Sequence, residues 1–180
     1  MFMNRILLFV CASFLCATVV AQKDAERTQM DEVDPNSVYN ATYAFCFAKH
    51  TDWPEARKSG GFKIAVLGSP STFKELVARF SDVPLGGQTV EMIDANSIDQ
   101  VKSAHIVLLS RTSADKLPEL VKTLKGAAIL IISHAENGLE TGADVNFIIK
   151  DNLLRYELNQ QSAEEKDITF GSMLIQSAEK

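Results

Sequence analysis

The sequence predicts an α/β fold: a mostly parallel sheet covered by helices, followed by a C-terminal antiparallel hairpin and a final helix. Two observations support this class. Strand-like and helix-like segments alternate over residues 62–133. Three of the strands are near-continuous apolar runs, at 64–67, 106–109 and 128–132, and such runs are typical of parallel strands buried on both faces. With 46% hydrophobic and 23% charged residues, the chain has the composition of one globular domain.

Residues 1–21 have the features of a secretory signal peptide. Arg5 supplies a positive charge, and the uncharged apolar run after it is short for a membrane span. Small residues end the run, so we expect cleavage between Ala21 and Gln22. An uncleaved membrane anchor is the alternative, and the length of the run disfavours it. The mature chain is then exported and has no membrane-inserted segment.

Residues 22–34 hold seven charges in thirteen positions and predict a polar tether. A single domain is expected over residues 35–180. Signal cleavage removes two of the three cysteines and leaves Cys46, so an exported chain has no internal disulfide and depends on its core for stability. The whole chain has a net charge of −5 and no basic cluster, which argues against nucleic acid as a partner.

The domain is expected to begin with a helix. Asp34 can cap its N-terminus, Pro35 suits its first turn, and helical spacing continues until Trp53-Pro54, where the second proline ends it. Strands are then expected at 62–68, 88–94, 105–110 and 127–133, with helices at 70–80, 97–102 and 115–124. The second of these strands is more polar than the others and is expected at an edge of the sheet.

The pattern changes after Ser133. A polar loop with glycines covers residues 134–144, and two strand-like segments follow it on either side of Asp151-Asn152. Because this pair is a tight-turn dipeptide, the two segments predict an antiparallel hairpin. In the tail, Ser162 and Glu165 have the spacing of a capping box. The tail ends with an apolar set, Met173, Leu174, Ile175 and Ala178, and a final helix is expected there.

Polar side chains follow three of the predicted parallel strands. Gly68-Ser69 follows the first strand, Ser110-Arg111 the third and Ser133-His134 the fourth. If the strand order is 2-1-3-4, it reverses between the first and third strands, and ligands of open α/β sheets bind at such reversals. Ser69 and Arg111 would face one crevice, whose hydroxyl and cation suit an anion. The alternative is that these serines only cap the helices that follow.

Cys46 and His50 lie four residues apart, so both side chains lie on one face of a helix. A zinc site takes three or four ligands, and the sequence has no second pair of this kind. A nucleophilic dyad needs a polar cleft, whereas Cys46 lies between Phe45 and Phe47. We therefore interpret the pair as packing residues, and we expect no metal, no cofactor and no enzymatic activity.

Several segments, taken in order, carry a resemblance. They are "YNATYAFCFAKHTDWP", "FKIAVLGSPSTFKEL", "HIVLLS", "AAILIISHAENGLETGADVNFIIKDNLLRYELN" and "SMLIQSA". In this order they resemble the first helix, the strands, the loop, the hairpin and the last helix of the YfiR-like family (YfiR/HmsC type). The resemblance covers about residues 38–178. Its motif residues are expected to be structural, and they are Phe45, Phe47, Lys49, Trp53, Pro54, Gly142, Asn146, Phe147 and Asn159.

The resemblance implies a periplasmic, non-enzymatic regulator that binds a membrane-anchored signalling protein. The family is best known for restraining a diguanylate cyclase, which connects envelope conditions with cyclic di-GMP and biofilm formation. A membrane-anchored sensor or a second copy of the chain is an alternative partner, and a small-molecule sensor that uses the crevice is the alternative function. Two features depart from the family. Some relatives depend on disulfides that this chain cannot form internally, and Thr141-Gly142 stands where relatives often have a glycine pair.

Overall fold

The computed structural model describes residues 35–179. Its elements in chain order are α2 (Ser37–His50), β1 (Thr51–Asp52), η1 (Glu55–Arg57), β2 (Phe62–Leu67), α3 (Pro70–Phe80), β3 (Val90–Ala95), η2 (Ile98–Val101), β4 (Ile106–Leu109), η3 (Arg111–Lys116), α4 (Leu117–Thr123), β5 (Leu130–Ser133), α5 (Gly138–Thr141), β6 (Val145–Lys150), β7 (Leu153–Leu158), α6 (Gln160–Glu164), β8 (Thr169–Phe170) and α7 (Ser172–Ser177). The expected signal peptide, its cleavage site and the tether lie outside the described residues. The structure starts α2 at Ser37 with Asn36 as its N-cap, so the expected cap at Asp34 and first turn at Pro35 are wrong. Within 35–179, no helix has the length and apolar character that a membrane crossing needs.

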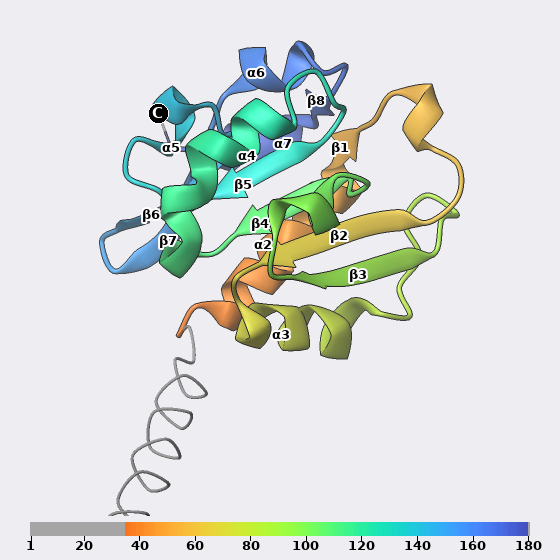
Figure 1. The fold of residues 1–180 in the computed structure, drawn as a ribbon, viewed down its shortest axis with the longest axis horizontal. Coiled ribbons are helices and arrows are strands. Elements are labelled where there is room, and N and C mark those ends of the chain that lie inside the picture. Colours follow the sequence, from red (N-terminus) through yellow and green to blue (C-terminus); the bar gives the residue numbers. More distant parts are fainter. Residues whose placement is uncertain (1–34, 180) are drawn as a thin grey trace, which may run out of the picture. The chain divides into compact units, whose positions relative to one another are not determined.

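The larger sheet has the strand order on which the predicted crevice depends. Its strands lie in the order β3-β2-β4-β5-β6-β7, so the first four predicted strands follow the order 2-1-3-4 and β3 is an edge strand (Figure 1). β2 pairs in parallel with β3 and β4, β4 with β5, and β5 with β6. β7 pairs antiparallel with β6, and Asp151 and Asn152 form the predicted turn at φ +52° and +60°. Positive φ at both positions is typical of a type I′ hairpin.

The sequence does not predict the second sheet, in which β1 pairs antiparallel with β8. Thr51 of β1 lies opposite Phe170 of β8. The first helix therefore ends at His50, before the Trp53-Pro54 stop, because the chain becomes extended at Thr51 to form this pairing. Gly171 adds a further bond, since its N–H donates to the His50 carbonyl at 2.8 Å. The end of α2 is thus joined to the C-terminal part of the domain.

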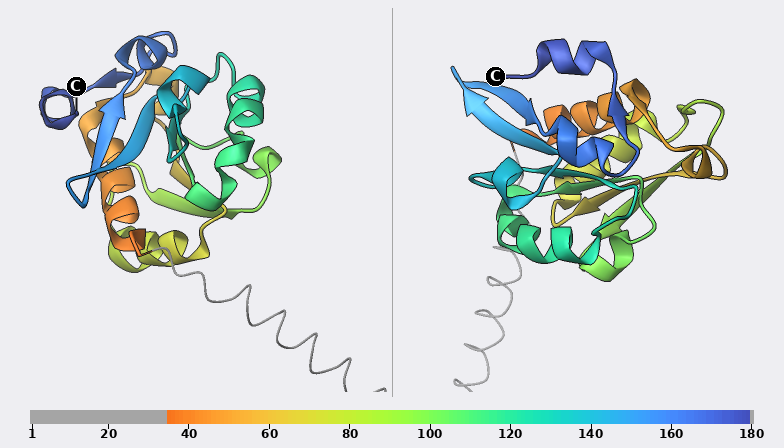
Figure 2. Two further views of the ribbon diagram at one scale, coloured as in Figure 1. Left: turned by 90° about the vertical axis from the view of Figure 1, so that its left-hand side faces the viewer. Right: turned by 90° about the horizontal axis from the view of Figure 1, so that it is seen from above.

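Alternate residues of each buried strand face opposite layers of helices, because side chains alternate along a strand. In β2, Ile64 and Val66 belong to a cluster with residues of α2, α3 and α7, whereas Ala65 and Leu67 belong to a cluster with residues of α4 and η2. Figure 2 shows α2 and α7 on one side of the sheet and α4 on the other. The sheet is covered on both faces, as its apolar runs predict.

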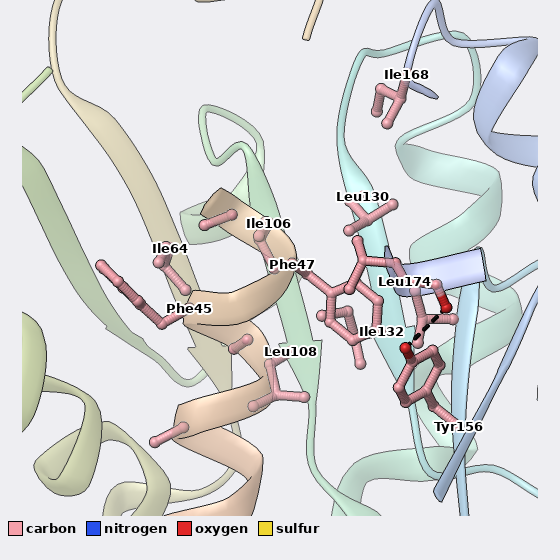
Figure 3. Close-up of a cluster of buried hydrophobic side chains, with 14 of the residues drawn as sticks. Phe45, Phe47, Ile64, Ile106, Leu108, Leu130, Ile132, Tyr156, Ile168 and Leu174 are labelled. Atoms are coloured by element: carbon pink, nitrogen blue, oxygen red, sulfur yellow. Dashed lines mark hydrogen bonds between the residues drawn. The ribbon is translucent and has the colours of Figure 1, made fainter. Parts of the chain in front are cut away.

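Phe47 packs between the sheet and the C-terminal elements (Figure 3). Its ring makes an edge contact with Tyr156, with the ring centroids 5.0 Å apart, and Tyr156 donates a hydrogen bond to the Leu174 carbonyl at 2.8 Å. On another side of α2, the Phe45 ring stacks on Phe80 of α3 at 4.2 Å. The two motif phenylalanines on α2 therefore hold this helix against the hairpin and α3.

Asp144 and Lys166 form a buried ion pair. Asp144 is fully buried, and its two carboxylate oxygens accept from Lys166 Nζ at 2.6 and 2.7 Å. The same carboxylate accepts from Ser162 Oγ and from the Ile131 N–H, each at 2.7 Å. Lys166 also donates to the Ile129 carbonyl at 3.2 Å. This group of bonds links β5, the start of β6, α6 and the segment after α6.

Two helices differ from their predictions. Asn159 caps α6, since its side chain accepts from the Ser162 N–H at 3.0 Å, and the expected capping box at Ser162 and Glu165 is wrong. The Ser162 hydroxyl donates a hydrogen bond to the Asp144 carboxylate instead. The helix expected at 115–124 is preceded by the 3₁₀ turn η3, and only its second part is α-helical. The bond from Ser162 to Asp144 could not be read from a local pattern, because the two residues are eighteen positions apart.

Candidate functional site

The carboxyl ends of β2 and β4 meet at the reversal in strand order, where the sequence predicts a ligand crevice. Protein atoms fill this space. Gly68 has a φ of +83°, and a Cβ placed there would lie 2.2 Å from Ser113 Oγ and 2.8 Å from Ser110 Oγ. Thr112 Oγ1 also donates to the Gly68 carbonyl at 3.3 Å. The chain after β4 packs directly on the chain after β2, so this position needs a glycine.

The three serines of the predicted crevice make bonds within the protein. Ser69 caps α3, since its Oγ accepts from the Thr72 N–H at 3.3 Å. Ser110 Oγ lies 3.0 Å from Thr112 Oγ1. Ser133 Oγ donates to Asn146 Oδ1 at 2.6 Å. All three side chains are buried, and these contacts agree with the capping and packing roles that are the alternative to ligand binding.

Arg111 and His134 lie on a separate cavity, at the carboxyl ends of β4 and β5. It has a volume of about 640 Å³ and is also lined by α5 and β6. The His134 ring lies 4.9 Å from the Phe147 ring. Gly138 packs so closely beside the cavity that a Cβ there would lie 2.2 Å from Asn146 Oδ1. The structure therefore brings together two of the five predicted crevice residues and leaves the serines outside this lining.

The lining of this cavity carries both signs of charge. Arg111 shares it with the carboxylates of Glu136, Glu140 and Glu157. An incoming anion would meet one guanidinium and three carboxylates, so the charge of the lining does not favour an anion. The anion site at the strand ends stays a prediction. A cavity is present there, but its lining does not carry the net positive charge that would attract an anion.

Cys46 is half-buried on α2. Burial raises the pKa of its thiol, although the charge of Lys49 opposes the shift. A raised pKa keeps a thiol protonated and weakly nucleophilic near neutral pH. This supports the interpretation of Cys46 as a packing residue. In the part of the chain that the structure describes, no group of three or more His, Cys, Asp and Glu side chains is placed to hold a metal ion.

Large apolar side chains are exposed on α2, on the β6–β7 hairpin and on α7. We call them the apolar surface, and they are Tyr39, Ile149, Leu153, Met173 and Ile175. Both views in Figure 2 show these three elements side by side, in orange, light blue and dark blue. A cavity of about 300 Å³ lies between α2, β7 and α7, and Cys46 and Met173 are among its lining residues. Neighbouring elements that each expose large apolar side chains are candidates for an interaction surface.

Sequence reasoning missed most of this surface. It identifies the apolar set of the last helix without saying which members are exposed, and in the structure Leu174 is buried while Met173 and Ile175 are exposed. A helix of six residues has room for little more than one buried position. The hairpin part of the surface could have been predicted from the sequence. Ile149 and Leu153 lie close to the Asp151-Asn152 turn, and side chains near a hairpin turn extend beyond the core.

The Trp53-Pro54 motif lies against the start of β2. The Trp53 ring makes edge contacts with Phe62 and with His105, at centroid distances of 5.2 and 5.7 Å. His105 Nδ1 accepts from the Lys63 N–H at 3.0 Å, and its Nε2 lies 3.0 Å from the Arg57 carbonyl oxygen. Because the carbonyl can only accept, Nε2 carries the proton and the ring is neutral. The motif thus connects the segment after β1 with β2 and β4.

A family model described as YfiR/HmsC-like matches residues 37–179. The chain belongs to the YfiR/HmsC-like family. The match confirms the resemblance seen in the sequence, and it runs from the first residue of α2 to the segment after α7. No curated protein matches the chain.

Most motif residues of the YfiR/HmsC-like chain make contacts within its fold. Beyond the aromatic residues described above, Gly142 ends α5 at a φ of +111°, and Asn159 caps α6. Asn146 Oδ1 accepts a hydrogen bond from the Ser133 hydroxyl. Lys49 differs from these residues because its side chain is exposed. The motif therefore identifies the fold more directly than it identifies a binding site.

This YfiR/HmsC-like domain should lose stability as the pH falls from about 7 to about 5, in part through His105. Burial is the main cause that lowers the pKa of His105, and the charges of Arg57 and Lys63 add to it. A histidine with a lowered pKa in the folded state contributes stability that is complete above its ordinary pKa of 6.5 and declines below it. His105→Gln should therefore flatten the pH profile of the free energy of unfolding, measured with urea.

His50→Gln is the matched control for this prediction, because it removes a histidine from α2 instead of from the core. Its profile should keep the decline towards acidic pH. A His105→Gln profile as steep as that of the wild type would contradict the role given to His105.

Proposed function

We propose that this YfiR/HmsC-like protein is a periplasmic, non-enzymatic regulator that binds a membrane-anchored signalling protein. By resemblance to the family, that partner is a diguanylate cyclase, and the pathway is cyclic di-GMP and biofilm control. The family match over residues 37–179 supports a regulatory role. The signal peptide predicted at residues 1–21 supports export to the compartment where such a partner exposes its sensory part.

The apolar surface is the observation that carries this proposal. Tyr39 and Leu153 are 59% and 54% exposed, which is a large share for apolar side chains of this size. The cavity between α2, β7 and α7 offers a place for an apolar side chain of the partner, and buried anchors of this kind dominate many interfaces. Lys150 and Arg155 form ion pairs with Glu179 at the margin, which gives the surface a polar rim.

The edge of β7 is partly covered by the chain itself. The Glu179 N–H donates to the Tyr156 carbonyl at 2.9 Å, and the Glu179 carboxylate pairs with Lys150 and Arg155. A partner strand cannot use the Tyr156 carbonyl while this contact is in place. We therefore expect the partner to bind through side chains on the apolar surface rather than by adding a strand to the sheet.

A photo-crosslinking amino acid at Leu153 or Met173 should capture a membrane-anchored signalling protein in intact cells, because both side chains are exposed on the apolar surface. Mass spectrometry of the crosslinked product identifies the captured protein. The same amino acid at Val83 should capture it roughly tenfold less. Val83 is a matched position, since it is exposed and apolar but follows α3, outside the apolar surface.

Leu153→Glu should weaken the captured complex by roughly tenfold or more, because a carboxylate in an apolar interface loses its water without gaining a partner. Val83→Glu is the control and should leave capture unchanged. Both variants should unfold at the wild-type temperature, since both side chains are exposed in the free protein. Equal effects of the two variants, or capture from position 83 alone, would contradict the proposal.

A further inference from the structure

His105 lies directly before β4 and connects it with two other segments of the chain. Its side chain is 4% exposed, and its ring stacks on Phe62 with the centroids 4.3 Å apart. Its backbone N–H donates to the Lys63 carbonyl at 2.8 Å, and its Nδ1 accepts from the Lys63 N–H at 3.0 Å. On the other edge of the ring, Nε2 donates to the Arg57 carbonyl at 3.0 Å. The neutral ring therefore extends the pairing of β2 with β4 and also holds η1.

The segment at residues 54–61, which contains η1, is held by hydrogen bonds rather than by packing. None of its residues is buried. The Arg57 carbonyl accepts from Gln88 Nε2 at 3.1 Å as well as from His105, and the Arg57 guanidinium donates to the Ala104 carbonyl. Segments with few buried contacts open locally at a lower cost than unfolding of the whole domain. The bonds around Arg57 therefore decide whether this segment stays in place.

A proton on Nδ1 of His105 is incompatible with this arrangement. The Lys63 N–H is directed at Nδ1, so a protonated ring places two donors against each other and deprives that N–H of its acceptor. Turning the ring does not help, because both nitrogens of an imidazolium are donors. Arg57 covers the Nε2 side of the ring. Exposure of the charged ring to water on that side therefore requires segment 54–61 to move.

The charged groups that face His105 oppose its protonation. Arg57 of η1 and Lys63 of β2 bring positive charge, and the Glu91 carboxylate of β3 pairs with Lys63 at 3.4 Å. Burial is the main cause that lowers the pKa of His105, although the bond to the Arg57 carbonyl opposes the shift. A group whose pKa is lowered in the closed form binds a proton more readily in the open form, so a falling pH favours opening.

We propose that His105 is an acid-sensitive latch whose protonation releases segment 54–61 while the sheet stays folded. Near neutral pH, the bonds of its two ring nitrogens to η1 and β2 keep the segment closed. The latch uses no residue of the apolar surface or of the Arg111 cavity, so the inference stands apart from the regulatory role proposed above. It also goes beyond the acid destabilisation expected for the whole domain, because a single segment opens in a protein that is otherwise folded.

Hydrogen exchange followed by mass spectrometry tests the latch on protein purified from cells that express the full chain, without denaturant. Between about pH 7 and about pH 5, the protection of segment 54–61 should fall roughly tenfold after correction for the intrinsic exchange rate. The amides of β5 should keep their protection. Trp53 gives a second readout, since it is the single tryptophan of the chain and its ring lies 5.7 Å from that of His105. Its fluorescence should change over the same pH range.

His105→Gln separates the latch from other effects of acid, because glutamine offers an acceptor and a donor but takes up no proton in this range. The protection of segment 54–61 in this variant should not depend on pH. His50→Gln, on α2, is the control and should keep the wild-type response. If His105→Gln fails to fold, nitrogen-15 NMR of the wild-type imidazole decides, since protonation of His105 should follow the same pH range as the loss of protection.

Three results would overturn the proposal. The first is protection of segment 54–61 that is the same at both pH values while His105 becomes protonated. The second is a wild-type pH response in His105→Gln. The third is an equal loss of protection in β5, which would show that acid unfolds the whole domain instead of releasing one segment.

Discussion

Replacing Asp144 with alanine should lower the free energy of unfolding by about 3–5 kcal/mol. The carboxylate is fully buried and accepts from Lys166, Ser162 and the Ile131 N–H. Its removal leaves the Lys166 ammonium, whose side chain is 12% exposed, without its counter-charge in a poorly solvated place. The Ile131 N–H and the Ser162 hydroxyl lose an acceptor at the same time. Urea unfolding followed by circular dichroism measures the change.

Asp52→Ala is the matched control, because Asp52 is also paired with a lysine but is exposed. It should cost less than about 1 kcal/mol. The combined replacement Asp144→Leu with Lys166→Met should recover part of the loss caused by Asp144→Ala, since no buried charge is then left unpaired. If Asp144→Ala and Asp52→Ala destabilised the domain equally, the buried pair would not have the structural role described here.

Gly68→Ala should destabilise the domain by about 2–4 kcal/mol. Its φ of +83° is unfavourable for alanine, and the added methyl group would meet Ser113 Oγ at 2.2 Å. Ser113 is buried and cannot move aside without disturbing the start of η3. Thermal and urea unfolding both report the loss.

Gly60→Ala separates the two causes of that loss. Gly60 has a similar φ, +76°, but a Cβ there would meet no atom within 4 Å. It should therefore cost only the backbone term, about 1–2 kcal/mol. The excess cost at Gly68 measures how tightly the two strand ends pack. Equal costs at the two positions would mean that the crevice between β2 and β4 has room for a side chain, contrary to the packing described above.

Which strands lie inside the sheet and which lies at its edge could be predicted, because both depend on features that lie within each segment. The apolar runs of β2, β4 and β5 need burial on both faces, whereas the polar β3 tolerates an edge. The turn at Asp151-Asn152 is equally local, since both residues adopt the positive φ that the hairpin requires. Such features determine which strands lie inside the sheet before any distant contact is known.

The C-terminal contacts could not be predicted, because each joins residues that are far apart in the sequence. β1 and β8 have two residues each, which is too short for a periodic pattern. Nothing local pairs Asp144 with Lys166, and Ser162 has two available roles, a cap or a bond to that carboxylate. The structure selects the second role because the buried carboxylate needs a donor and Asn159 already caps the helix.

The candidate site shows the same limit. Topology brings Arg111 and His134 to one end of the sheet, so the fold rule places them on a common cavity. It says nothing about the serines beside them, whose hydroxyls bond to nearer groups such as the Thr72 N–H and Asn146. Nor does it reveal the apolar surface, which depends on which side of a six-residue helix faces the hairpin.

The pairing of β1 with β8 also determines when the domain can finish folding. Thr51 and Phe170 lie near opposite ends of the described chain, so their contact closes a loop that contains every strand of the larger sheet. Contacts between such distant segments form late, because closing the long loop costs entropy before the contacts themselves contribute any stabilisation. The C-terminal residues of the domain must therefore be available for pairing before the end of α2 can take its final position. In a protein that we propose crosses a membrane as an extended chain, this arrangement postpones completion of the fold until translocation is almost over.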